Sequence, residues 1–156
     1  MLNDPKLQQL LSKVDKSKFK NIPCVKRVEK PWGYELIFTS EDLPYTGKLM
    51  HLNAGTRQSL QVHDKKLETY YLGSGRGGVL IENDKGEMER IEFEKDKGYT
   101  TKVGQKHRIF AITDCDVLEF STPEAGNTYR LEDDYSRPSE TEEMRKDPNR
   151  GWKEPV

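Results

Sequence analysis

The pattern of hydrophobic and polar positions divides the chain into one helical segment and a long series of short strands. A capping side chain precedes a proline within residues 3–5, and apolar residues recur at helical spacing over residues 7–14, so we expect a short amphipathic helix. From Val25 onward, short alternating runs are separated by turn residues, which is typical of an all-β barrel. The expected strands span residues 25–29, 34–39, 47–53, 57–63, 68–72, 78–82, 87–92, 98–102, 107–112 and 116–122.

The two ends of the chain differ from this central part. Residues 13–20 are rich in lysine and are interpreted as a solvated linker. After Arg137 the composition turns to Pro, Ser, Glu, Arg and Lys, which predicts an extended or partly disordered tail. We therefore expect a helix and linker over residues 1–24, a barrel over residues 25–137, and a tail over residues 138–156.

The composition is that of one small domain with a partly polar interior. A chain of 156 residues is long enough for one core, but only 33% of its residues are hydrophobic and 34% are charged. The 26 basic and 27 acidic residues are well mixed and leave a net charge of −1. Nucleic acid binding requires a broad basic surface, so we expect no nucleic-acid partner.

The sequence shows no sign of membrane insertion or secretion. No apolar run approaches the roughly 20 residues of a membrane span, and the N-terminus lacks the apolar segment of a signal peptide. Cys24 and Cys115 have no CxxC spacing, so we interpret them as reduced thiols, with a disulfide as the alternative. The expectation is a cytoplasmic protein without a membrane partner.

Candidate chemistry lies in residues 57–75, which have the form of a strand, a turn and a second strand. Alternation over the first strand places the polar side chains of Arg57, Ser59, Gln61 and His63 on one face. Residues 64–66 are interpreted as the turn, and a direct hairpin would bring the next strand back beside this face. A row of polar residues is unusual on the inner face of a barrel, so this row indicates a functional site.

The donor atoms on this segment form part of a metal site. Gln61, His63 and Glu68 offer an amide oxygen, an imidazole and a carboxylate, and a divalent ion usually needs a further protein ligand. His107 follows the turn at Gly104 and precedes a strand, so it could supply that ligand. The alternative is that His63 is a surface histidine and His107 a hydrogen-bonded core histidine.

A resemblance to the cupins favours the metal site. The first cupin motif is Gly, five residues, His-x-His, three or four residues, Glu, six residues, Gly; Gly55, residues 61–63, Glu68 and Gly75 match its spacing, with Gln61 in place of the first histidine. The second motif is matched by Gly104 and His107, but Lys102 replaces its proline and no asparagine stands at position 111. The resemblance implies a double-stranded β-helix, or jelly-roll barrel.

The ligand set Gln, His, Glu and His resembles that of the phosphomannose isomerase branch of the cupins. Residues 30–35 (KPWGYE), 59–63 (SLQVH) and 130–137 (RLEDDYSR) resemble three segments of that branch in the same order. This resemblance implies a divalent metal, zinc above all, held by Gln61, His63, Glu68 and His107. It also implies a sugar phosphate as the substrate and aldose-ketose interconversion as the reaction.

Several basic and polar residues are candidates for binding or catalysis. Arg130 matches the closing segment of the resembled branch, and a guanidinium suits a phosphate. The alternative for these residues is a salt bridge or a charge at the rim of the barrel. The predicted catalytic residues are Lys48 and Arg130, and the predicted substrate-binding residues are Arg57, Ser59, Tyr70 and Arg137.

The same residues are compatible with two other functions, and one apolar face predicts an assembly state. A cupin that binds a metal and a small sugar or anion without turnover is one alternative. An oxygen-using iron cupin is another, and Gln61 argues against it because an amide replaces an imidazole. Leu60 and Val62 place apolar groups on the face opposite the site, so we expect a homodimer.

Overall fold

The computed structural model describes residues 4–20, 23 and 25–147. Among these residues it contains one α-helix, two 3₁₀-helices and eleven strands. These elements are α1 (Pro5–Ser12), η1 (Lys16–Lys18), β1 (Lys26–Lys30), β2 (Gly33–Ile37), β3 (Thr46–Leu52), β4 (Leu60–His63), β5 (Glu68–Ser74), β6 (Gly77–Glu82), β7 (Met88–Glu92), β8 (Gly98–Thr101), β9 (His107–Ala111), β10 (Cys115–Ser121), β11 (Thr128–Glu132) and η2 (Met144–Lys146).

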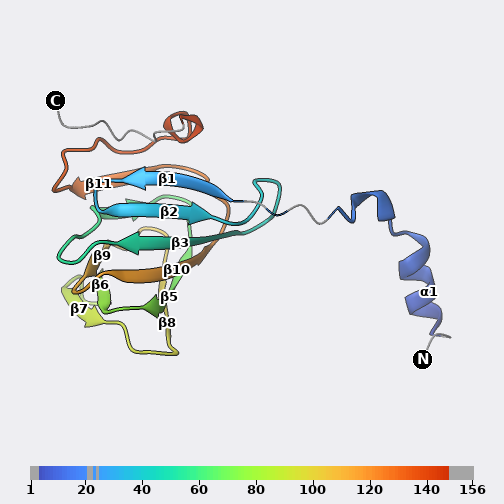
Figure 1. The fold of residues 1–156 in the computed structure, drawn as a ribbon, viewed down its shortest axis with the longest axis horizontal. Coiled ribbons are helices and arrows are strands. Elements are labelled where there is room, and N and C mark those ends of the chain that lie inside the picture. The colour runs from blue at the N-terminus through green and yellow to red at the C-terminus, as the bar shows by residue number, and fades with distance from the viewer. Residues whose placement is uncertain (1–3, 21–22, 24, 148–156) are drawn as a thin grey trace.

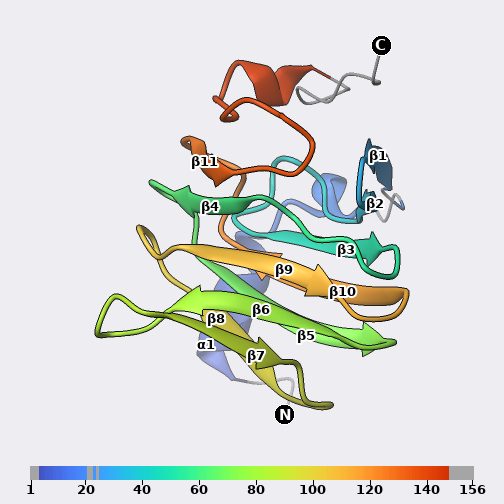
Figure 2. The ribbon, with the colours of Figure 1, turned by 90° about the vertical axis from the view of Figure 1, so that its left-hand side faces the viewer.

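The strands form two sheets that face each other across a common interior (Figures 1 and 2). One sheet has the order β1-β2-β3-β10-β5-β8 and the other has the order β11-β4-β9-β6-β7. All of the pairings between these strands are antiparallel. The predicted all-β jelly-roll barrel with a short N-terminal helix is therefore confirmed.

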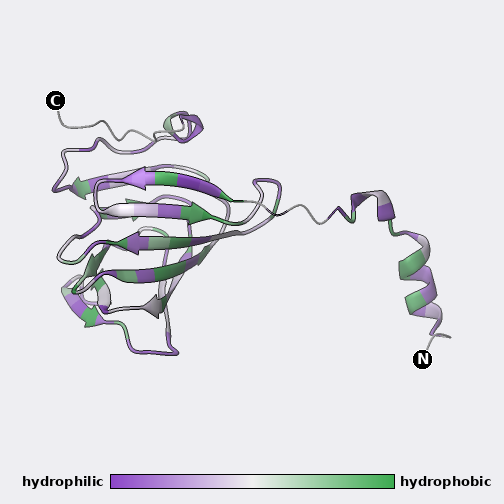
Figure 3. Ribbon diagram, in the orientation of Figure 1, coloured by the Kyte–Doolittle hydropathy of each residue, from purple (hydrophilic) through white to green (hydrophobic). Residues whose placement is uncertain are grey.

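The inner face of the six-stranded sheet is apolar at one end and charged at the other. In the register of β3 and β10, Met50 lies opposite Val117, and Lys48 lies opposite Glu119. All four side chains are buried. Figure 3 shows hydrophobic and hydrophilic positions following one another along the strands of this sheet. The apolar end holds the core, and the charged end holds the site described below.

Helix α1 begins as the sequence predicts and stands apart from the barrel (Figure 1). The Asp4 carboxylate accepts a hydrogen bond from the Lys6 amide, and Pro5 occupies the first helical turn. None of the helix residues is buried. Within the described part of the chain, no helix has both the length and the apolar content that a membrane crossing requires.

Three details of the barrel differ from the sequence prediction. The strand expected to begin at Arg57 begins at Leu60, and the strand β11 was not predicted. The direct hairpin is wrong, because β4 and β5 belong to opposite sheets and residues 64–67 connect one sheet to the other. Cys115 is a buried free thiol, and Cys24 lies outside the described residues.

Residues 138–147, which the sequence assigns to the tail, pack beside β11; we call this segment the C-terminal strap. Glu140 and Thr128 exchange two backbone hydrogen bonds of 2.8 and 2.9 Å. The Gly126 amide donates to the Glu142 carboxylate, and the strap ends in η2, in which Arg145 is buried. The strap therefore forms one wall of the barrel's charged end, while residues 148–156 lie outside the described residues.

Candidate metal centre

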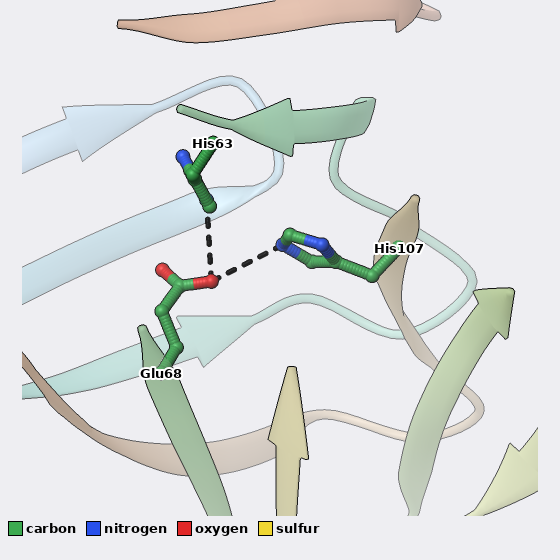
Figure 4. A group of neighbouring side chains, drawn as sticks. All are labelled: His63, Glu68 and His107. Carbon is green, nitrogen blue, oxygen red and sulfur yellow. Dashed lines mark ion pairs between the residues drawn. The ribbon is translucent and has the colours of Figure 1, made fainter. Parts of the chain in front are cut away.

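Three strands bring the predicted metal ligands together. Gln61 and His63 lie on β4, and His107 lies on the neighbouring β9, where it is the register partner of Gln61. Glu68 lies at the start of β5 in the opposite sheet, so its carboxylate reaches the histidines across the barrel interior (Figure 4). His63, Glu68 and His107 are all buried, and they form a group that could hold a metal ion.

The distances within this group suit a first coordination shell. Oε2 of Glu68 lies 3.2 Å from Nε2 of His63 and 3.1 Å from Nε2 of His107. Ligand atoms that are about 2.0 Å from an ion at tetrahedral angles lie roughly 3.3 Å from one another. The carboxylate oxygen therefore lies from both imidazoles at nearly the spacing that a zinc-sized ion requires, and all three ligand atoms lie within 4.8 Å of one another.

The hydrogen bonds behind the two imidazoles also fit a metal. Nδ1 of His107 lies 2.9 Å from the Gln105 carbonyl oxygen, which can only accept, so Nδ1 carries a proton in this contact. That tautomer leaves the Nε2 lone pair free for a ligand bond. Nδ1 of His63 lies 3.0 Å from the Thr128 hydroxyl, which can accept the equivalent hydrogen bond.

Gln61 completes the set after a rotation of its amide. Its Nε2 lies 3.3 Å from Nε2 of His63 and 3.4 Å from Nε2 of His107, while its oxygen accepts a hydrogen bond from Ser59. A half-turn of the amide exchanges its two ends and places the oxygen, which is the ligand atom, toward the imidazoles. The Ser59 hydroxyl oxygen can then accept from the amide nitrogen, so the exchange keeps a hydrogen bond at that end of the amide.

Glu68 is held in its ionised form by its neighbours. Burial alone would raise the pKa of this carboxyl, but the Lys66 ammonium at 2.7 Å and the contacts with the two histidines lower it well below its usual range. The Tyr70 hydroxyl also donates to Glu68 over 2.6 Å, and burial together with this carboxylate raises the pKa of Tyr70 well above its usual range. Tyr70 thus supports the ligand from behind and stays protonated.

The ligand group borders a cavity of about 50 Å³ at the charged end of the barrel. Four basic and five acidic residues line this cavity, so a divalent ion would make its net charge positive. The lining residues are Lys30, Trp32, Glu35, Lys48, Met50, Gln58, Ser59, Gln61, His63, Glu68, Glu119, Glu124, Thr128, Arg130, Arg137 and Glu140.

Lys48, a predicted catalytic residue, lines this cavity and contacts three carboxylates. Its Nζ lies 2.8 Å from Glu124, 3.4 Å from Glu119 and 3.8 Å from Glu35. Burial lowers the pKa of Lys48, but these three carboxylates outweigh that effect and raise it above the usual value. Lys48 is therefore a protonated group that can donate a proton, and it is not positioned to act as a base.

The two arginines of the predicted closing segment line the same cavity. Arg130 donates to the Glu140 carboxylate and to the Pro138 carbonyl, while its buried Nε has no hydrogen-bond partner among the described residues. Arg137 pairs with Asp133 at 2.6 Å. A buried N–H without a partner is energetically costly. The Nε of Arg130 is therefore a candidate donor to a bound ligand.

Arg57 lies elsewhere. Its guanidinium pairs with Asp134 on the outside of the barrel, and half of its side chain is exposed. The structure brings the other predicted site residues together: Tyr70 and His107 contact Glu68 without lining the cavity, and the rest line it.

Sequence reasoning missed the residues that surround Lys48. Lys66 was assigned to a turn, yet its Nζ contacts Glu119 at 2.6 Å and Glu124 at 3.1 Å and is buried. Glu119 lies on β10, where alternation with the apolar residues of the same strand places it inward. That alternation is a signal in the sequence, but no comparable pattern indicated Lys66 or Glu124.

Comparison with solved structures identifies the fold. The structure is similar to oxalate decarboxylase of Lactobacillus farciminis in a formate complex, with 23% identity over 69% of this chain and 34% of that one and a TM-score of 0.59. It is similar to the capsular polysaccharide assembling protein CapF of Staphylococcus aureus, with 20% identity over 83% and 40% of the two chains and a TM-score of 0.57.

KdgF of Halomonas sp. is a smaller similar structure, with 16% identity over 65% of this chain and 88% of that one and a TM-score of 0.54. This chain spans about a third of the length of the oxalate decarboxylase chain. No protein-family model matches the sequence, and no curated protein matches it either. The structural neighbours have the cupin fold, and this chain has the same fold with a possible metal site of two histidines and a glutamate.

Proposed function

We propose that this protein is a metal-dependent isomerase of sugar phosphates, interconverting an aldose and a ketose through an enediol. The observation that carries the proposal is the ligand group Gln61, His63, Glu68 and His107, of which the first three line a cavity whose other residues are mostly charged or polar. A divalent ion, zinc above all, suits this set of nitrogen and oxygen donors. With that ion the cavity favours an anionic substrate.

The reaction moves a proton between neighbouring carbons of the sugar. When bound, the ion supplies a Lewis acid that stabilises negative charge on a sugar oxygen. Glu119 is the carboxylate that takes the proton from one carbon and returns it to the next, since it is buried and lines the cavity. Lys48, held as an ammonium 3.4 Å from Glu119, exchanges a proton with the oxygen whose charge changes.

Arg130 binds the phosphate in this proposal. Its Nε is a buried donor without a hydrogen-bond partner among the described residues, and a phosphate oxygen would supply the acceptor. Binding energy at the phosphate positions the reacting carbons at the other end of the substrate. The proposal therefore requires phosphorylated sugars to react and unphosphorylated sugars not to.

A groove next to the cavity supplies the space that a sugar phosphate needs. The groove has a volume of about 910 Å³, and Glu124 lines both it and the cavity. Residues from the β2–β3 connection, from the segment before β11 and from the C-terminal strap form its walls. A hexose phosphate held between the metal ligands and Arg130 would place the middle of its carbon chain past Glu124 in this groove.

The test is turnover of mannose 6-phosphate, and then of other hexose and pentose phosphates, by metal-loaded protein in deuterium oxide. We expect solvent deuterium at C2 of the product. Replacing Arg130 by alanine should lower kcat/KM roughly 100-fold and leave the metal content unchanged, because the substrate is misplaced. His107→Ala should lose metal and turnover together, and Arg76→Ala, at an exposed pair with Glu92, should change neither.

One observation favours a second function, which is binding without turnover. A cavity of about 50 Å³ holds an ion with a few water molecules, and ligand pockets usually reach roughly 300 Å³ or more. A cupin that binds a metal and a small anion would need no larger space. If metal-loaded protein binds inorganic phosphate or sugar phosphates in calorimetry and converts none of the sugars, the isomerase proposal is wrong and this function replaces it.

A further inference from the structure

The C-terminal strap reaches the metal centre through one buried arginine. Nη2 of Arg145 donates to the Thr128 hydroxyl over 2.9 Å, and its Nε donates to the Glu140 carboxylate over 3.2 Å. Only 7% of the Arg145 side chain is exposed. A charged side chain is rarely buried to this extent without specific partners. The hydrogen bond from Arg145 to the Thr128 hydroxyl is one of the contacts that hold it there.

The same hydroxyl is the partner of a metal ligand. Oγ1 of Thr128 lies 3.0 Å from Nδ1 of His63, and both residues are buried. The other ring nitrogen of His63 faces Glu68 and belongs to the ligand group. Arg145, Thr128 and His63 therefore form a continuous chain of hydrogen bonds from the strap to the ligand group.

The direction of these hydrogen bonds follows from the chemistry of the three groups. Arg145 has donors only, so the Thr128 oxygen accepts from it and keeps one further lone pair. A histidine that binds a metal through Nε2 carries its proton on Nδ1. That proton meets the remaining lone pair of Thr128, and this contact fixes the plane of the ring.

We propose that Thr128 and Arg145 are positioning residues of the metal centre, and that ion binding at His63 and docking of the C-terminal strap stabilise each other. The inference rests on metal binding by the proposed isomerase, but not on its substrate or its turnover. It assigns to Thr128, which the strap holds through Arg145, the role that Gln105 performs for His107, with the difference that Gln105 uses a backbone carbonyl. The hydrogen bond at Nδ1 of His63 is therefore the one of the two that a side-chain substitution can remove.

Coupling between the ion and the strap follows from the shared contact. The Thr128 hydroxyl contacts the strap through Arg145, and the Thr128 backbone exchanges two hydrogen bonds with Glu140. An ion that fixes His63 also fixes Thr128, so it lowers the probability that the strap opens. By reciprocity, loss of the strap contact lowers the affinity of the site for the ion by the same factor.

The test compares four variants, Thr128→Val, Thr128→Ser, Arg145→Met and Lys146→Met, with the unmodified chain. Affinity for Co²⁺ is measured by competition with a chelator, and the visible absorption of the bound Co²⁺ reports the ligand geometry. Valine keeps the shape of threonine without the hydroxyl, and serine keeps the hydroxyl. Lys146 is the matched control, because it is the exposed cation next to Arg145.

We expect Thr128→Val to bind Co²⁺ about 10- to 100-fold more weakly, with an altered spectrum, and Arg145→Met to change both in the same direction. Thr128→Ser should restore the affinity to within about threefold and the spectrum completely. Hydrogen exchange adds a second readout. Co²⁺ should slow exchange at the Glu140 amide in the unmodified chain and in Lys146→Met, and much less in Thr128→Val.

Two outcomes would overturn the inference, and they differ from each other. If the unmodified chain binds Co²⁺ and folded Thr128→Val binds it equally well with the same spectrum, Thr128 and Arg145 do not position the ligand, while the proposed metal centre stands. If the unmodified chain binds no Co²⁺, the metal centre itself is wrong and the inference falls with it.

Discussion

Lys66 places a buried ammonium group among three carboxylates, at 2.7 Å from Glu68, 2.6 Å from Glu119 and 3.1 Å from Glu124. Burial lowers the pKa of Lys66, but the three carboxylates raise it well above the usual value, so the group stays charged. Replacing Lys66 by methionine removes the charge and leaves the carboxylates to repel one another. We expect a loss of about 3–5 kcal/mol in the free energy of unfolding, measured by urea titration of the metal-free protein.

The neighbouring lysine is the control for this prediction. Lys65 pairs with Glu142 at 3.6 Å, and both side chains are more than half exposed. Lys65→Met should change the free energy of unfolding by less than about 1 kcal/mol. Equal effects of the two substitutions would show that the buried contacts of Lys66 do not stabilise the barrel.

Asp133 makes the stability of the fold depend on pH, and its pKa shift gives the direction of that dependence. Burial raises the pKa of Asp133, but hydrogen bonds from the Arg137 side chain and backbone outweigh it and lower the pKa below the usual value. The folded-state pKa is thus below the unfolded-state pKa. The stabilisation is present above the unfolded-state pKa near 4 and is lost as the pH falls through the folded-state pKa.

Asp133→Asn tests this sign. At pH 7 the variant should be less stable than the unmodified chain by roughly 1–3 kcal/mol, because a charged hydrogen-bond acceptor is lost. Unfolding by urea at a series of pH values should show this difference shrinking below pH 4. A difference that stays constant down to pH 2.5 would contradict the assignment of the shift to Asp133.

At the scale of elements, the sequence predicts strands better than it predicts which strands pair. Nine of the observed strands begin and end within two residues of the expected ones, and a tenth, β4, begins three residues late. Alternation of polar and apolar residues identifies such strands because it depends on neighbours in the chain. The connection from His63 to Glu68 was predicted as a hairpin, since a short polar turn is equally compatible with a pairing in one sheet and a crossing to the other.

In the candidate site, too, the sequence predicts some residues and misses others. Gln61, His63, Glu68 and His107 could be predicted because a motif with fixed spacing contains them. The charged surroundings could not, because Lys66, Glu124 and Arg145 come from a connection and from the C-terminal segments. Their contacts depend on how the closed barrel brings distant segments together, and no local periodicity reports that.

Strand β11 shows how a missed strand leads to a missed site residue. It was missed because its five residues, Thr128–Glu132, are mostly polar or exposed and show little contrast between faces. A bulge at Arg130–Glu132 interrupts the alternation further. Yet this strand carries Thr128 behind His63 and places Arg130 in the cavity. The strand with the weakest sequence signal thus contributes directly to the site.

For the whole molecule, we propose a homodimer that forms through the outer face of the five-stranded sheet. The predicted apolar residues Leu60 and Val62 are half-buried on β4, and Val62 pairs in register with Tyr129. Tyr129 and Leu131 on β11 are 47% and 51% exposed, so they extend the apolar patch to the edge of the sheet. A contiguous exposed apolar patch is a usual feature of protein interfaces.

Light scattering after size-exclusion chromatography tests this proposal. The unmodified chain should have twice its monomer mass of 18.1 kDa at tens of micromolar concentration. Tyr129→Glu and Leu131→Glu should each shift the mass toward the monomer, because a dimer would bury two charged side chains without partners. Phe120→Glu is the matched control, since Phe120 is 51% exposed on the other sheet. If the unmodified chain is a monomer, the homodimer is excluded. If Phe120→Glu alone dissociates the dimer, the interface lies on the other sheet.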